Sequence, residues 1–139
     1  MDQSSRAPIS ILIVDDHPVV RAGLTSMLGT CTQLSIAGSA TNGREALQFL
    51  DLHPVDVMLL DLRMPAMSGI DTLLSLKTHK FAPRTIVLTT YEMDEDVFKA
   101  VQAGALGYLL KDTCLSEMVE AIEVVQSGNV ICHAISHRA

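Results

Sequence analysis

Five polar residues of this chain each stand at the carboxyl end of a short apolar run. They are Asp15, Asp16, Asp61, Thr89 and Lys111. If the runs are neighbouring parallel strands, their carboxyl ends meet at one edge of a sheet, and ligands of doubly wound sheets bind outside that edge. We therefore expect these side chains to form one site.

Three carboxylates at such a site require a cation, because they repel one another. Two unit charges 4 Å apart repel by roughly 4 kcal/mol at an effective dielectric constant of about 20. The available donor atoms are oxygens, which favour Mg²⁺, an ion that commonly binds one or two carboxylates together with phosphate oxygens. The metal and the ammonium group of Lys111 would neutralise an incoming phosphoryl group, and the Thr89 hydroxyl can donate a hydrogen bond to it. Asp61 is then a suitable nucleophile for phosphoryl transfer.

Each of these residues also has an ordinary structural interpretation. An aspartate after a strand commonly caps a helix or lies in a solvated loop, Thr89 suits a strand, and Lys111 suits an exposed surface. The functional interpretation depends on all of them occupying the same expected edge, which independent capping does not explain.

The elements that must position these residues can be predicted from the alternation of apolar runs with stretches of helical periodicity, which is typical of βα units around a parallel sheet. The expected strands are Ile9–Val14, Leu34–Ala40, Val57–Leu60, Thr85–Thr89 and Gly107–Leu110. Val57–Leu60 is apolar throughout, as a strand covered on both faces must be, whereas Leu34–Ala40 alternates like an edge strand.

Helices are expected after each of these strands. Pro18 suits a first helical turn, Asn42 suits an N-cap, and Gly104 suits the end of a helix. We therefore expect an α/β fold of the flavodoxin-like kind, with a five-stranded parallel sheet in the order 2-1-3-4-5 and helices on both faces.

Composition limits the possible functions. The 139 residues are 48% hydrophobic and 19% charged, which suits one folded domain of common size. The net charge of −6 argues against binding to a nucleic-acid backbone, which requires Lys and Arg. The sequence has no apolar run near the ~20 residues that span a bilayer and no signal-peptide pattern at its start, so we expect no membrane contact and a cytoplasmic location.

The cysteines show neither the spacing of a zinc site nor the even number of a disulfide framework, and we expect reduced thiols. They are Cys31, Cys114 and Cys132. Cys132 with His133 and His137 comes nearest to a metal cluster, but three loosely spaced ligands near a chain end are more often incidental.

Four stretches of the sequence resemble the motifs of receiver domains in bacterial two-component response regulators. They are ILIVDDHPVVRAGL (11–24), VDVMLLDLRMPAMSGID (55–71), IVLTTYE (86–92) and AGALGYLLKD (103–112). The stretches occur in family order at family-like intervals and are particularly similar to receivers of the NarL/FixJ type.

The resemblance implies a domain organisation. Residues 1–8 form an N-terminal extension, residues 9–128 the receiver domain, and residues 129–139 a tail that begins a linker to a C-terminal helix-turn-helix DNA-binding domain absent from this chain. A stand-alone single-domain receiver that acts by protein contact is the alternative.

The same resemblance implies a role for each acidic residue. Asp61 accepts a phosphoryl group from a phosphohistidine of a sensor histidine kinase, Asp16 binds Mg²⁺ directly, and Asp15 acts beside it, often through water. The backbone carbonyl of Arg63 matches a further metal ligand. The implied partners are the sensor kinase and a second copy of the chain in a homodimer, while DNA is reached only through the output domain.

Three residues match positions that, in the family, contact the phosphoryl group or change conformation in response to it. Thr89 matches the hydroxyl that bonds the phosphoryl group, Lys111 its counter-charge, and Tyr108 the aromatic residue that changes rotamer when Thr89 moves. An aromatic residue in an outer strand is otherwise ordinary packing. Asp112 follows Lys111 where many receivers have proline, so we do not expect the cis peptide bond of those receivers.

Two other functions share this fold class. A haloacid-dehalogenase-type phosphotransferase places a second acid two residues after its nucleophilic aspartate, where this chain has Arg63. A flavodoxin-like nucleotide or flavin module needs a phosphate-binding loop rich in Gly, Ser and Thr after the first strand, where this chain has Asp15, Asp16 and His17. Neither pattern fits, and the resemblance to receiver domains implies a signalling domain with slow self-catalysed phosphorylation and dephosphorylation instead of a turnover enzyme.

Overall fold

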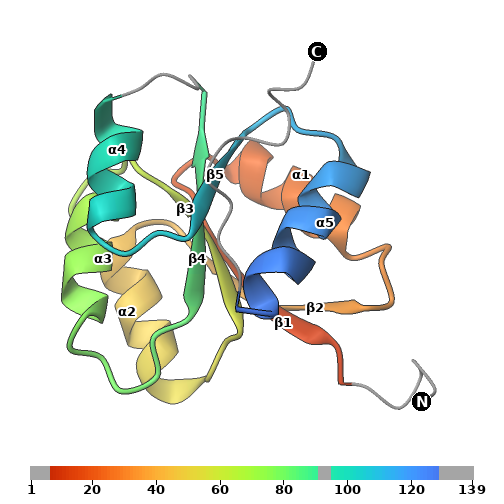
Figure 1. Cartoon of the computed structure of the whole chain (residues 1–139), viewed down its shortest axis with the longest axis horizontal. Helices are drawn as coiled ribbons and strands as arrows, with labels where there is room; N and C mark the ends of the chain where they lie inside the picture. The colour runs from red at the N-terminus through yellow and green to blue at the C-terminus, as the bar shows by residue number, and fades with distance from the viewer. Residues whose placement is uncertain (1–6, 91–94, 129–139) are drawn as a thin grey trace.

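Strands and helices alternate along the chain and form one parallel sheet with helices on both faces (Figure 1). The computed structural model describes residues 7–90 and 95–128. The elements are β1 (Ile9–Val14), α1 (Pro18–Leu28), β2 (Leu34–Ala40), α2 (Gly43–Leu52), β3 (Val57–Asp61), α3 (Gly69–Leu76), β4 (Arg84–Thr89), α4 (Glu95–Gln102), β5 (Gly107–Leu110) and α5 (Leu115–Gln126). Helices α2, α3 and α4 cover one face of the sheet, and α1 and α5 cover the other (Figure 1).

The sheet has the order β2-β1-β3-β4-β5, which confirms the sequence prediction. Two strand ends differ from the prediction by one residue, since β3 continues to Asp61 and β4 begins at Arg84. Asp61 is therefore the last residue of the central strand, and pairing of β3 with β4 restrains its backbone.

The burial of the strands follows their place in the sheet. Every residue of β3 is buried, because β1 and β4 flank it and helices cover both of its faces. β2 lies at one end of the sheet, is buried only at its end residues Leu34 and Ala40, and alternates exposed with half-buried residues between them.

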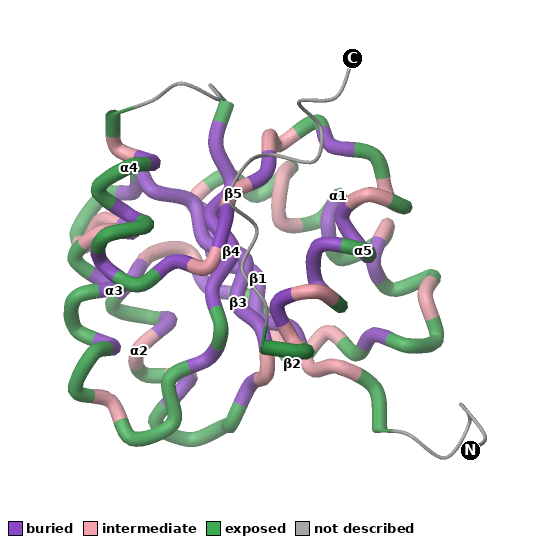
Figure 2. The backbone as a smooth tube through the Cα atoms, in the orientation of Figure 1, coloured by how far each residue is buried: buried purple, intermediate pink, exposed green. Residues whose placement is uncertain are grey.

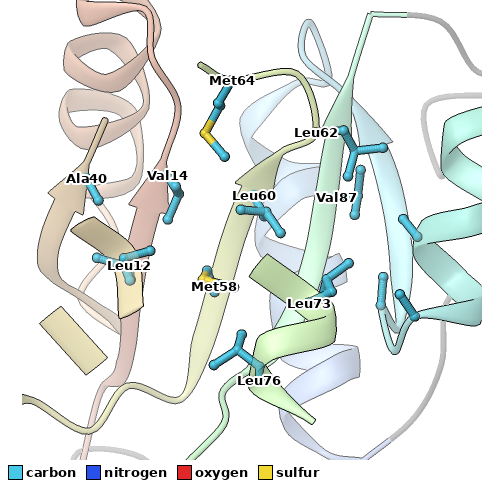
Figure 3. Close-up of a cluster of buried hydrophobic side chains, with 14 of the residues drawn as sticks. Leu12, Val14, Ala40, Met58, Leu60, Leu62, Met64, Leu73, Leu76 and Val87 are labelled. Carbon is cyan, nitrogen blue, oxygen red and sulfur yellow. The ribbon is translucent and has the colours of Figure 1, made fainter. Parts of the chain in front are cut away.

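The sheet separates two layers of buried apolar side chains (Figure 2). Successive residues of a strand point to opposite faces, so Leu12 and Leu60 belong to one layer and Ile13 and Leu59 to the other. Figure 3 shows the layer that contains Leu12 and Leu60. These two layers hold the central strands, and with them the strand ends, in fixed relative positions.

Side chains cap two of the helices at the end of the sheet that carries the polar residues. The Asn42 side chain accepts a hydrogen bond from the Glu45 N–H at 3.0 Å, and Glu45 accepts one from the Thr41 N–H at 2.8 Å. The second bond lowers the pKa of Glu45. Ser68 caps α3 by accepting from the Asp71 N–H at 3.2 Å. The expected cap at Asn42 is confirmed, and both loops that enter these helices are held.

Some sequence predictions concern residues outside the described ranges. The tail over 129–139, with Cys132, His133 and His137, is one of them. Cys31 and Cys114 are described and are free thiols. No helix in residues 7–90 or 95–128 is both long enough and apolar enough to cross a membrane.

Candidate functional site

The five polar residues predicted from the sequence meet at the carboxyl edge of the sheet. Val14 of β1 pairs with Leu60 of β3, so the residues that follow, Asp15 and Asp61, lie at the same level. The Lys111 ammonium nitrogen lies 3.0 Å from Asp15 Oδ2 and 3.5 Å from Asp61 Oδ1. One cation from the end of β5 therefore contacts carboxylates from the ends of β1 and β3.

A hollow of about 160 Å³ opens at this edge. Its lining consists of His17, Asp61, Leu62, Arg63, Leu88, Thr89, Thr90 and Lys111. The lining brings together the predicted nucleophile Asp61, the Thr89 hydroxyl and the Lys111 ammonium group. Leu62 and Leu88 form apolar parts of the wall. A small anionic group bound here would therefore lie near Asp61, Thr89 and Lys111 at once.

The acidic cluster has the donor set of a divalent cation site. Asp15, Asp16, His17 and Asp61 each offer a ligand atom, and these atoms all lie within 4.8 Å of one another. Asp15 is fully buried, and Asp15 Oδ2 and Asp16 Oδ1 make no hydrogen bond with the described residues, although Lys111 and His17 respectively lie within ion-pair distance of them. Three clustered carboxylates are costly to bury unless cations compensate them, so these oxygens fit a hard ion such as Mg²⁺ in addition to Lys111.

His17 is a member of this cluster that the sequence analysis did not select as a site residue. Its Nδ1 lies 3.0 Å from Asp15 Oδ1 and 3.2 Å from Asp16 Oδ1, and its backbone N–H donates to Asp15 Oδ1 at 2.9 Å. The only sequence signal was its position directly after two aspartates. The imidazole holds the two carboxylates in position at the edge of the hollow.

The environment of Asp61 disfavours its charge. Burial raises the pKa of Asp61, and the nearby carboxylate of Asp15 raises it further. The charge of Lys111 and the hydrogen bond from the Arg63 N–H act in the opposite direction but do not cancel these effects. A carboxylate with a raised pKa is more basic than an ordinary aspartate, which favours its use as a nucleophile toward phosphorus.

Arg63 has two contacts that point in different directions. Its backbone N–H donates to Asp61 Oδ1 at 3.4 Å, and its guanidinium nitrogen Nη2 lies 3.2 Å from Asp96 Oδ2 at the start of α4. The sequence resemblance assigns its backbone carbonyl to the metal. The role of that carbonyl as a metal ligand stays a prediction.

Tyr108 lies in β5 on the same face as Thr89. It pairs with Val87 of β4 and packs, half-buried, against the core layer on the α4 side. Thr89 is two residues after Val87 and therefore points to the same face of β4. The two side chains are diagonal neighbours across adjacent strands, which is the arrangement that a coupled switch requires, but the switch itself stays a prediction.

The loop between β3 and α3 turns back closely on Asp61. The Gly69 N–H donates to the Leu62 carbonyl at 2.9 Å, and a Cβ on Gly69 would lie 2.6 Å from the Asp61 carbonyl oxygen. Within this loop Ala66 has φ of 70°, and the Met67 N–H donates to the Pro65 carbonyl at 2.7 Å across it. Such a three-residue turn is rare for a residue with a side chain. The loop is therefore held in one tight conformation under the hollow.

Residues 11–123 match the response regulator receiver domain family. The chain belongs to this family. Receiver domains are signalling domains of two-component response regulators. The peptide bond between Lys111 and Asp112 is trans in this receiver domain, as expected where Asp112 replaces the proline of many receivers.

Relatives of known type support this membership. The receiver domain is 33% identical over 128 residues to the nitrate/nitrite response regulator protein NarL of Escherichia coli, covering 92% of this chain and 59% of NarL. It is 40% identical over 121 residues to the transcriptional regulatory protein YdfI of Bacillus subtilis, covering 87% of this chain and 56% of YdfI. The chain thus spans little more than half the length of these curated relatives.

Solved structures show the same fold. The signal receiver domain of NarL from Mycobacterium tuberculosis superposes with a TM-score of 0.83 at 31% identity, covering 89% of this chain and all of that one. The response regulator ChrA of a heme-sensing two-component system superposes with a TM-score of 0.77 at 34% identity, covering 90% of this chain and 60% of ChrA. The resemblance to the NarL type predicted from the sequence is confirmed.

Proposed function

We propose that this receiver domain is switched by phosphorylation of Asp61, with Mg²⁺ as cofactor and a sensor histidine kinase as phosphoryl donor. The observation that carries the proposal is the position of the Lys111 ammonium group, 3.0 Å from Asp15 and 3.5 Å from Asp61, beside a hollow that Asp61 and Thr89 line. A nucleophile, a hydroxyl donor and a counter-charge surround one space large enough for a phosphoryl group. We place this reaction in the cytoplasm as part of the same proposal.

The reaction transfers a phosphoryl group between two protein side chains. The phosphorus–nitrogen bond of a kinase phosphohistidine breaks while a phosphorus–oxygen bond to Asp61 forms, and the histidine nitrogen takes the electron pair. Asp15, Asp16, Asp61 and the Arg63 carbonyl would hold the Mg²⁺, which would supply positive charge to the phosphoryl oxygens. Slow phosphorylation by small donors and slow hydrolysis belong to the same proposal, because the same charges act without the kinase.

The chain's own residues bind and read the new group. The Lys111 ammonium group moves from the two carboxylates to a phosphoryl oxygen, and the Thr89 hydroxyl donates to another. Thr89 shifts toward Asp61, and Tyr108, its diagonal neighbour in β5, turns inward into the space left behind. The surface formed by α4, β5 and α5 then changes shape for a partner.

The output of this switch lies in part outside the chain. NarL is a response regulator protein and YdfI is a transcriptional regulatory protein. The chain covers only 59% of NarL and 56% of YdfI. We propose that residues 1–8 are an extension, that the receiver is 9–128, and that 129–139 begin a linker to a DNA-binding domain. A stand-alone receiver that acts by protein contact is the second candidate, and a homodimer is compatible with either.

The test of the proposal is chemical. Wild-type protein incubated with phosphoramidate and Mg²⁺ is expected to gain about 80 Da, the mass of one phosphoryl group, in an intact-mass measurement. The Asp61→Asn variant is expected to gain nothing. Asp112→Asn, which removes an exposed carboxylate next to Lys111, is the matched control and should be phosphorylated like wild type. An adduct that forms without Mg²⁺, or that persists in Asp61→Asn, contradicts the proposal.

A further inference from the structure

We propose that Arg63 links the phosphorylation site to helix α4 electrostatically. In the unphosphorylated protein its guanidinium group holds Asp96 in the first turn of α4. When Asp61 carries a phosphoryl group, the guanidinium group turns to that group and releases Asp96. This inference rests on the proposed function and adds a second route by which the state of Asp61 reaches α4, beside the one through Thr89 and Tyr108.

The link is possible because Arg63 belongs to the site and reaches the helix. It stands two residues after Asp61, and its backbone N–H donates to Asp61 Oδ1 at 3.4 Å, which fixes the start of its side chain. The residue also lines the hollow in which the phosphoryl group would lie. Its Nη2 is 3.2 Å from Asp96 Oδ2, so the far end of the same side chain contacts α4.

The Arg63–Asp96 ion pair is exposed, so another anion can readily replace Asp96. The Arg63 side chain is 67% exposed and that of Asp96 is 34% exposed, and ion pairs near the surface are weak because water and salt screen them. A pair of this kind holds a helix in place without locking it. A stronger anion within reach of the guanidinium group can therefore replace Asp96.

A phosphoryl group on Asp61 is such an anion. It carries roughly −1.5 to −2 charges near neutral pH, compared with a single charge on Asp96, and it presents three acceptor oxygens. A guanidinium group binds two oxygens of a phosphate side by side, a geometry that Lys111 cannot offer. The new group also lies in the hollow that Arg63 already lines, so the side chain needs only to rotate.

Helix α4 is well suited to respond to the loss of this contact. It is eight residues long, from Glu95 to Gln102, and only Val97 and Ala100 are buried. Short helices with few buried side chains open locally at low free energy. Release of Asp96 is therefore expected to loosen the first turn of α4 and leave the rest of the domain folded.

Hydrogen exchange of the α4 segment tests the link, with Asp96→Asn as the variant and Glu95→Gln as its matched control. Both changes remove one negative charge from the same helical turn, but only the first removes the carboxylate at 3.2 Å from the Arg63 guanidinium group. In wild type, phosphoramidate and Mg²⁺ are expected to raise exchange over residues 95–102 several-fold. Asp96→Asn should show the faster exchange before phosphorylation and little change after it, while Glu95→Gln should behave like wild type.

Intact mass measured on the same samples separates this inference from the proposed function. If Asp96→Asn gains the phosphoryl mass and its α4 segment still responds as in wild type, the link is wrong and the proposed function stands. If Asp96→Asn and Glu95→Gln exchange alike before phosphorylation, the resting contact has no role and the link is equally wrong. A wild-type protein that gains no phosphoryl mass overturns both.

Discussion

Asp61 is the residue whose surroundings conflict most with its charge. Asp61 is 5% exposed, and burial raises its pKa. The nearby Asp15 carboxylate raises the pKa of Asp61 further. The folded protein therefore binds a proton at Asp61 more tightly than the unfolded chain does. The stabilisation from this group is present below the ordinary pKa of an aspartate and is lost as the pH rises through the raised pKa.

The Asp61→Asn variant is expected to be more stable than wild type at neutral pH, because it removes a charge that folding disfavours. We expect a gain on the order of 1 kcal/mol in the free energy of unfolding, the usual scale of one substitution. The gain should shrink as the pH falls and Asp61 takes up its proton. Urea denaturation at a series of pH values measures both effects, with Asp112→Asn as the exposed control. A variant less stable than wild type at pH 7 would contradict the assigned environment.

The loop from β3 to α3 is the element that fixes the backbone under Asp61. Gly69 approaches the Asp61 carbonyl so closely that a side chain has no space, and the turn at Ala66 has a φ that side chains rarely adopt. The backbone of Asp61, the proposed acceptor, is thus set by the end of β3 on one side and by the entry to α3 on the other. Changes at the entry to α3 should therefore reach the chemistry at Asp61.

Gly69→Ala is expected to destabilise the domain by about 1 to 3 kcal/mol, the usual cost of an extra group in a tightly packed place. It should also slow phosphorylation by phosphoramidate, because the backbone at Asp61 must move. The control is Gly23→Ala in the middle of α1, where an added Cβ meets no atom within 4 Å. That change should stabilise the helix by about 0.5 to 1 kcal/mol and leave phosphorylation unchanged. Equal effects of the two changes in urea denaturation would show that the loop tolerates a side chain.

The 139-residue chain has a net charge of −6, and a cluster of its carboxylates lies at one edge of the sheet. A cation that binds this cluster only in the folded state must stabilise the fold as a whole. The gain depends on concentration and reaches about 2.7 kcal/mol when the free ion is at 100 times its dissociation constant.

Mg²⁺ is therefore expected to raise the melting temperature of wild-type protein, and a chelator should reverse the rise. Asp16→Asn should lose most of this response, since it removes a proposed direct ligand. Glu120→Gln, which removes an exposed acid from α5, should retain it. Calorimetry with KCl at matched ionic strength separates specific binding from screening. A rise of the same size in KCl alone would argue against a metal site.

The fold was predictable because its main signals are local. The apolar runs marked all five strands to within one residue, and the parallel arrangement placed Asp15, Asp61 and Lys111 at one edge without knowledge of any contact. The remaining features depend on side-chain orientation and on tertiary contacts. His17 belongs to the site only because its ring turns toward both aspartates, and Arg63 meets Asp96 only because the chain returns to the same edge at α4.

The position of β5 gives the sheet unequal stiffness. β5 is the shortest strand, with four residues, and lies at the end of the sheet with β4 as its paired neighbour, whereas β3 is held from both sides. Lys111 extends from β5 and Asp61 from β3. If Asp61 is phosphorylated as proposed, the attraction between Lys111 and the new charge is expected to displace β5 more than β3. The direction of that motion would follow from the unequal support of the two strands, and it would carry Tyr108 and the outer surface of the sheet with it.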